Sequence, residues 1–323
     1  MENSQIPKRN LLNYEEKICP FCHSKNVIKA GQRFKREGRV QKYYCKTCKK
    51  YFCSSPMLHK TYPPQVILNG ISLYNLGYKL DVANKKLGSQ FKHSVPKSTL
   101  HSWLKQYENI CTFTKYRRKF SFSPEEVIKQ KVFQHHQEYA FKFHHLKLNI
   151  LSKKFPEIKK YLWQIYKNCP QSIFEQGFRC SDFIIPNLYL RRTKTKDNNA
   201  VALTKLALLL AKKNKDRHQA VQNFMLINDT ATVAIEVPIY LYSNEVPELK
   251  LNKPITGHID VLQIRWDKVW ILDYKPEAKY NRVNSSHQVF LYKLALSKRT
   301  GIPLEYINCS YFDDKDYFEI WQN

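Results

Sequence analysis

Gly257-His258-Ile259-Asp260, followed thirteen residues later by Asp273-Tyr274-Lys275 and then by Gln288-Val289-Phe290-Leu291-Tyr292, decides the fold of the carboxyl-terminal part. β-branched and aromatic residues around the first two segments favour strands, and the third segment favours a helix. Residues two apart on a strand point to one face, so Asp273 and Lys275 are expected to be neighbours. The order predicts carboxylates and a lysine on adjacent strands.

Further elements extend this pattern on both sides. The strands of one sheet are expected at residues 232–242, 255–266, 268–275 and 306–312. Helices are expected at residues 200–213 and 285–298. The predicted order is helix, three strands, helix, strand, with Glu236 on the first strand.

These residue types suit metal-assisted cleavage of a phosphodiester. Mg²⁺ prefers oxygen ligands, which Asp260, Asp273 and the carbonyl of Tyr274 supply. A bound cation neutralises the phosphate and lowers the pKa of water. Lys275 would then orient that water or stabilise the charge that develops on the phosphate. Surface carboxylates at strand ends, with no catalytic role, are the alternative.

The order of these motifs resembles the PD-(D/E)XK nuclease superfamily, in particular its RecB-like branch. The resemblance implies a restriction-endonuclease-like αβββαβ core over residues 200–323 and a Mg²⁺ or Mn²⁺ cofactor. It implies metal ligation by His218, Asp260, Asp273 and Tyr274. The catalytic residues that it implies are Glu236, Asp260, Asp273, Lys275, Gln288 and Tyr292.

The sequence departs from many CRISPR-associated relatives of that branch, which hold an iron–sulfur cluster on four cysteines flanking the core. Here only Cys180 lies plausibly upstream and only Cys309 downstream. Two thiols cannot replace four ligands, so no cluster is expected.

Residues 1–62 carry two cysteine pairs, Cys19-Pro-Phe-Cys22 and Cys45-Lys-Thr-Cys48. Each pair has the spacing that lets one tight turn present two sulfurs, and four sulfurs favour a structural Zn²⁺. Strands at 27–30 and 41–44 would complete a zinc ribbon. Reduced surface cysteines are the alternative.

Residues 63–110 have the spacing of three short helices, starting near residues 64, 80 and 96. Leu100, Trp103 and Leu104 would form the buried stripe of the third helix. Such a unit is typical of a helix-turn-helix, with a small helical spacer as the alternative. Residues 18–108 resemble the DNA-binding front end of insertion-sequence transposase proteins.

The charge of the chain points to DNA as a partner. Residues 1–120 contain 24 basic and 6 acidic side chains, a net charge of +18 out of +27 for the chain. Solvated lysine faces in a generally basic proteome are the alternative. The residues expected to contact DNA are Arg33, Lys35, Arg36, Arg39, Lys97, Thr99, His101, Ser102 and Lys105.

Residues 111–199 carry no motif and are expected to form a helical linker or insert. The apolar residues from Phe133 to Ile150 are spaced for long helices, and residues 191–199 look like a loop. Adjacent histidines on a helix point in different directions. We therefore expect the pairs His135-His136 and His144-His145 to lie at the surface or at the edge of the core.

Together these features predict a multidomain chain of the α+β or α/β class, and we expect a metal-dependent deoxyribonuclease linked to a mobile element, a virus or DNA repair. A DNA-binding regulator or architectural protein that no longer cuts is the alternative. The first ten residues lack an apolar signal, and residues 201–211 are too short to cross a membrane. The sequence predicts a soluble, intracellular protein of undetermined oligomeric state.

Overall fold

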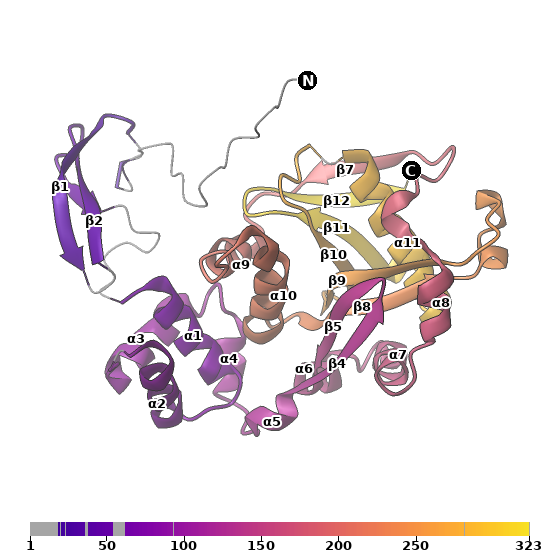
Figure 1. Ribbon diagram of the computed structural model, residues 1–323, viewed down its shortest axis with the longest axis horizontal. Coiled ribbons are helices and arrows are strands. Elements are labelled where there is room, and N and C mark those ends of the chain that lie inside the picture. Colours follow the sequence, from indigo (N-terminus) through magenta and orange to yellow (C-terminus); the bar gives the residue numbers. More distant parts are fainter. Residues whose placement is uncertain are drawn as a thin grey trace, which may run out of the picture.

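The computed structural model describes residues 19, 21–22, 24–35, 38–53, 62–92, 94–280 and 282–322, without the side chains of residues 34–40 and 282. It is a mixed α+β structure with a three-stranded and a nine-stranded sheet (Figure 1). Among the described residues, no helix has both the length and the apolar composition needed to cross a bilayer.

The small sheet lies near the amino terminus and at one end of the molecule (Figure 1). Its antiparallel strands, in spatial order, are β1 Val27–Lys35, β2 Gly38–Cys45 and β3 Tyr51–Cys53. The strands expected at 27–30 and 41–44 are confirmed. Cys45 ends β2 and Cys48 lies in the turn between β2 and β3, whereas Cys19 and Cys22 precede β1.

The helical module follows, and we use this name for α1 Pro64–Asn75, α2 Leu80–Phe91 and α3 Lys97–Tyr107. Pro64 begins α1. The first N–H groups of a helix have no intrahelical acceptor, so proline loses no hydrogen bond at this position. Leu100, Trp103 and Leu104 are buried, as expected. Two short helices lead on to the sheet, α4 Phe113–Arg117 and α5 Pro124–Val127.

The long helices expected from Phe133 to Ile150 are wrong for most of that segment. A hairpin replaces them, formed by β4 Ile128–His135 and β5 Gln137–His144, and helices begin only at His145. Phe141 and Phe143, two apart, are both fully buried, which is the period of a strand. The helices that follow are α6 His145–Leu151, α7 Pro156–Lys167 and α8 Gln171–Gln176.

The large sheet has the spatial order β4-β5-β8-β9-β10-β11-β12-β7, with the two-residue strand β6 Phe178–Arg179 paired to β9. Part of the loop expected at 191–199 is therefore a strand, because β7 pairs with β12. The other strands are β7 Leu190–Lys194, β8 Thr232–Leu241, β9 Ile255–Arg265, β10 Lys268–Tyr274, β11 Ile307–Phe312 and β12 Tyr317–Gln322.

Three helices complete this part: α9 Asn199–Ala207, α10 Arg217–Asn228 and α11 Arg282–Thr300. The expected helix at 200–213 thus ends six residues early, ahead of the polar run Lys212-Lys213-Asn214-Lys215-Asp216. The expected order of helix, three strands, helix and strand is present as α9-β8-β9-β10-α11-β11, but α10, which was not expected, lies between α9 and β8.

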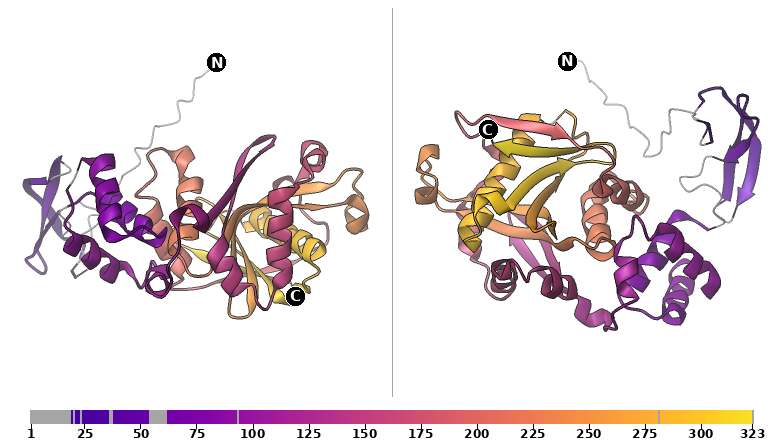
Figure 2. Two further views of the ribbon diagram at one scale, coloured as in Figure 1. Left: turned by 90° about the horizontal axis from the view of Figure 1, so that it is seen from below. Right: turned by 180° about the vertical axis from the view of Figure 1, so that it is seen from behind.

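The helices α10 and α11 pack in different cores. Figure 2 shows α10 next to the helical module and α11 away from it. Leu291 of α11 belongs to the core that contains α7, whereas Met225 of α10 belongs to a core shared with the helical module. A buried hydrogen bond of 2.9 Å from Asn75 Nδ2 to Asn228 Oδ1 also joins α1 to α10. The helical module and α10 therefore share one continuous interior.

The carboxyl end of α10 is held by a fully buried lysine. Lys147 Nζ donates to the backbone carbonyls of Leu226 and Asp229, which would otherwise lack partners at the helix end. Burial lowers the pKa of Lys147 to about 7. This contact fixes the turn that leads from α10 into β8.

Candidate active site

Three neighbouring strands each bring one carboxylate to the same level of the large sheet. The ladder between β8 and β9 pairs Ile235 with Val261 and Val237 with Ile259, which sets Glu236 opposite Asp260. The ladder between β9 and β10 ends at the pair Leu272–Val261, so the next positions are Asp273 and Asp260. The register alone therefore puts the three acidic residues in one row.

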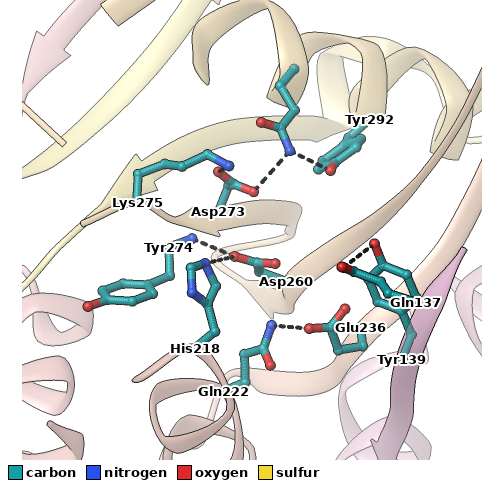
Figure 3. A network of polar contacts seen from close by, with 11 residues as sticks. Gln137, Tyr139, His218, Gln222, Glu236, Asp260, Asp273, Tyr274, Lys275 and Tyr292 are labelled. Carbon is teal, nitrogen blue, oxygen red and sulfur yellow. Dashed lines mark hydrogen bonds and ion pairs between the residues drawn. The ribbon is translucent and has the colours of Figure 1, made fainter. Parts of the chain in front are cut away.

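This row lies where the sheet divides. Beyond Val261 the strands β9 and β10 no longer pair, and β6 pairs with the first residues of β9. The division opens a cavity of about 280 Å³. Of the eight residues predicted for this site, only Tyr274 does not line the cavity; the lining residues are His218, Glu236, Asp260, Asp273, Lys275, Gln288 and Tyr292. Figure 3 shows the carboxylates between α10 and α11.

Glu236 has a strained backbone in the middle of its strand. Its φ of +50° lies in the left-handed region, which is unusual for a residue other than glycine. Ile235 and Val237 pack in different cores, so the strand changes face at this residue. Such strain concentrates at functional sites and costs of order 1–3 kcal/mol. Here it coincides with a glutamate that faces the cavity.

Burial and the repulsion of neighbouring carboxylates raise the pKa of Glu236 and of Asp273. Burial, and then the neighbouring Asp260, raise the pKa of Glu236 to about 8, although a hydrogen bond of 2.6 Å from Gln222 Nε2 opposes the rise. Burial raises the pKa of Asp273 to about 6, against the effect of Lys275. The site concentrates more buried negative charge than its own cation neutralises.

Lys275 lies beside Asp273, as its position two residues along the chain predicts. Its Nζ is 3.0 Å from Asp273 Oδ2. Burial lowers the pKa of Lys275, but Asp273 and then Asp260 more than offset this, so the pKa is raised. The ammonium is thus held in its charged form at the edge of the cavity.

Gln288 and Tyr292, one turn apart on α11, close the cavity from one side. Gln288 Nε2 donates to Tyr292 Oη at 2.6 Å and to Asp273 Oδ1 at 3.4 Å. Burial raises the pKa of Tyr292 well above its usual range, so the phenol stays neutral. A Cβ on Gly257 would lie 2.5 Å from the Tyr292 ring, which explains the glycine at that position.

His218 and Gln222 approach from α10 on the other side, as expected of residues four apart on a helix. His218 Nε2 is 3.8 Å from Asp260 Oδ2. The backbone N–H of Tyr274 donates to the same oxygen at 2.9 Å. The Tyr274 ring packs edge-on against His218. Gln222 was not predicted from the sequence, although its position four residues after His218 places both side chains on one face of a helix.

The β4–β5 hairpin supplies a wall that sequence reasoning missed altogether. His135 Nδ1 and His258 Nε2 are 2.9 Å apart, and Tyr139 stacks on His258 with ring centroids 3.5 Å apart. Of these residues, only His258 could have been placed at the site from the sequence. It lies two residues before Asp260 on one strand, so the two side chains point to the same face. The expected surface or core-edge placement is wrong for His135 and for His144, which are 3% and 0% exposed.

The donor set at the row of carboxylates fits a hard divalent cation. Glu236 Oε2 is buried and accepts no hydrogen bond within the described residues. The carboxylate oxygens are the ligand type that Mg²⁺ and Mn²⁺ take. The carboxylate oxygens of the row lie farther apart than the ligands of a formed metal site, and Lys275 lies beside Asp273. Among the described residues, only the four thiols near the amino terminus form a group of three or more ligand atoms within 4.8 Å of one another.

Stability of the metal-free protein is expected to fall as pH rises from about 5 to about 8. The folded pKa of Glu236 is about 8 and that of Asp273 about 6, against ordinary values of 4.5 and 3.8. The folded state therefore binds more protons in this window, and unfolding becomes easier as pH increases. Thermal melting in EDTA across this range measures the slope.

Glu236→Gln is the matched variant for this test, since it should remove the part of the slope above about pH 6. Addition of Mg²⁺ at pH 8 should raise the melting temperature of the unmodified protein more than that of the variant. Identical slopes for the two proteins would show that Glu236 does not titrate as described.

The four cysteines of the amino-terminal pairs form a second candidate site. Cys19 Sγ lies 3.5 Å from Cys48 Sγ, and Cys22 Sγ lies 3.6 Å from Cys45 Sγ. Backbone N–H groups, first that of Cys48, lower the pKa of Cys45 to about 6. The group can bind a metal ion such as zinc.

The predicted DNA contacts of α3 lie on its outer face. Lys97, His101, Ser102 and Lys105 are exposed, and Thr99 is half-buried. Of the predicted contacts in the small sheet, Arg33 is exposed. Arg36 lies outside the described residues, as do the side chains of Lys35 and Arg39.

No protein-family model, no curated protein and no solved structure matches this chain.

Proposed function

We propose that the chain is a Mg²⁺- or Mn²⁺-dependent deoxyribonuclease with a PD-(D/E)XK core. The observation that carries the proposal is the row of Glu236, Asp260 and Asp273 on three adjacent strands, with Lys275 beside Asp273. A regulator that binds DNA without cutting it would have no need for buried, mutually repelling carboxylates and a strained glutamate. Those features cost stability, and they favour catalysis as the reason for their presence.

Each residue has a distinct role in the proposed reaction. Asp260 and Asp273, with Glu236 and His218 at the rim, would hold the cation, which supplies charge neutralisation and a more acidic water. Lys275 presents its ammonium to the charge that develops on the phosphate and orients the attacking water. Gln288 fixes the Asp273 carboxylate, and Gln222 fixes that of Glu236.

We further propose that the amino-terminal part delivers the enzyme to DNA. The four thiols would hold a structural Zn²⁺ in a zinc ribbon, and the helical module would act as a helix-turn-helix. Lys97, His101 and Lys105 lie four residues apart on the exposed face of α3, so they share one side of the helix. That side can reach phosphates and base edges in a major groove.

Cleavage of supercoiled plasmid tests the proposal. The purified protein should convert supercoiled DNA into nicked or linear forms with Mg²⁺ or Mn²⁺, and should leave it intact in EDTA. Asp260→Asn should be inactive while it still retards duplex DNA in buffer without added Mg²⁺ or Mn²⁺. Binding without cleavage in either metal would make the chain a DNA-binding regulator instead.

A further inference from the structure

A second hollow, of about 850 Å³, lies at the far end of the large sheet from the row of carboxylates. It runs from the turn after α3 to the β9–β10 hairpin, and we call it the Trp266 groove. The hairpin and Asp273 lie at opposite ends of β10, about 20 Å apart at roughly 3.3 Å per residue. The Trp266 groove is therefore separate from the proposed active site.

The hairpin holds an exposed tryptophan in a backbone conformation that favours glycine. Arg265 pairs with Lys268, so Trp266 and Asp267 form a two-residue turn, with φ of +50° and +56°. Asparagine and glycine usually occupy such turns because they tolerate positive φ. The indole is 75% exposed, so it contributes little burial in return. Its presence calls for a reason other than stability.

A cation covers one face of this indole, Trp270 meets it edge-on with ring centroids 6.0 Å apart, and 75% of the residue remains exposed. The guanidinium carbon of Arg265 lies 4.6 Å from the Trp266 ring centroid and 4.3 Å from that of Trp270. Arg265 Nη2 also donates to Tyr317 Oη at 2.8 Å, which anchors the guanidinium. The open face is thus held as a platform on which a flat ring can stack.

The rest of the groove is basic. Lys194, Lys196, Lys205 and Lys315 line it and are exposed. Lys194 pairs with Asp316, but the ammonium groups of the other three form no ion pair with a carboxylate of the described residues. Of the acidic residues that line the groove, Asp229 is buried and accepts hydrogen bonds from Thr232 and Gln263. Asp197 is the one that remains exposed. The groove therefore presents an excess of unpaired positive charge.

We propose that the Trp266 groove binds single-stranded DNA, with a base stacked on the indole and backbone phosphates on the groove lysines. A stacking face beside unpaired cations is the combination that recognises unpaired nucleotides, because bases inside a duplex have no free face. Duplex DNA would meet the lysines but leave the indole unused. This proposal goes beyond the proposed hydrolysis and does not depend on it.

Fluorescence anisotropy of the full chain in EDTA, at about 0.15 M salt, tests the groove with labelled oligo(dT) of 20 nucleotides and with a 20-base-pair duplex. Trp266→Gly should weaken oligo(dT) binding at least about tenfold, in the range for loss of one stacked base. Because glycine relieves the positive φ, its melting temperature should stay the same or rise. Duplex affinity should change less than about twofold.

Two variants complete the design. Trp266→Phe keeps a stacking ring and should keep most of the oligo(dT) affinity. Trp321→Ala removes another partly exposed tryptophan, on β12 and outside the groove, and should change nothing. Unchanged oligo(dT) binding by Trp266→Gly, equal loss for the duplex, or equal loss in Trp321→Ala would overturn the proposal. Tighter binding of oligo(U) than of oligo(dT) would overturn the assignment to DNA. All binding is measured in EDTA, where no cleavage is expected. The binding results can therefore be interpreted even if the protein is not a nuclease.

Discussion

Lys275→Ala is expected to lower DNA cleavage at least about a hundredfold while duplex affinity changes less than about twofold. Loss of one preorganised electrostatic donor typically costs this much in rate, because its interaction strengthens only as charge develops in the transition state. The 3.0 Å contact with Asp273 places the ammonium beside the proposed metal ligands. Single-turnover cleavage with saturating protein and Mg²⁺ measures the rate free of binding effects.

Lys298→Ala is the control, since Lys298 is an exposed lysine in the last turn of α11. It should cleave as the unmodified protein does. The carboxylate of Asp273 loses its cation in Lys275→Ala, so its pKa should rise further and the melting temperature should be compared as well. Wild-type turnover by Lys275→Ala would exclude the proposed role of the lysine.

Cys45→Ser is expected to release the metal and unfold the small sheet. One Zn²⁺ per chain should be present in the unmodified protein. Binding of structural zinc by four thiolates is worth about 10–16 kcal/mol, and in small domains of this kind that energy is the folding energy. Elemental analysis measures the metal, and limited proteolysis around residues 27–53 measures the loss of structure.

Cys53 provides a control of the same chemistry, because it is a half-buried cysteine outside the group of four. Cys53→Ser should keep the metal and the resistance to protease. Purified protein without zinc, or with the absorption of an iron centre, would contradict the assignment.

The carboxyl-terminal strands were predictable because their own residues dictate them. Residues 232–241, 255–265 and 268–274 are rich in β-branched and aromatic side chains, and turn residues separate them. Asp273 and Lys275 were placed together by the alternation of side chains along one strand. Local rules of this kind predicted the strands and the pairing of Asp273 with Lys275. The roles of His218, Glu236, Gln288 and Tyr292 were expected only from the family resemblance, and other lining residues such as Phe174 and Arg179 were not predicted.

The β4–β5 hairpin could not be predicted in the same way. Phe133, Tyr139 and Phe143 fit a helical as well as an extended spacing, and β5 pairs with β8 over only two residue pairs, Lys142–Ile235 and Phe143–Ala234. Eight residue pairs join β4 to β5, and the burial of Phe141 and Phe143 in the core is a tertiary effect that local propensity does not contain. The misplaced His135 follows directly from that error.

The shared interior between the helical module and α10 has a geometric consequence. The helix that carries His218 and Gln222 packs against α1, so α3 and the cavity are held at one separation. A nuclease tethered by a loose linker would cut over a spread of positions around its binding site. If α3 binds a duplex and the cavity cleaves it, as proposed, the cut should fall at a fixed number of base pairs from the bound site.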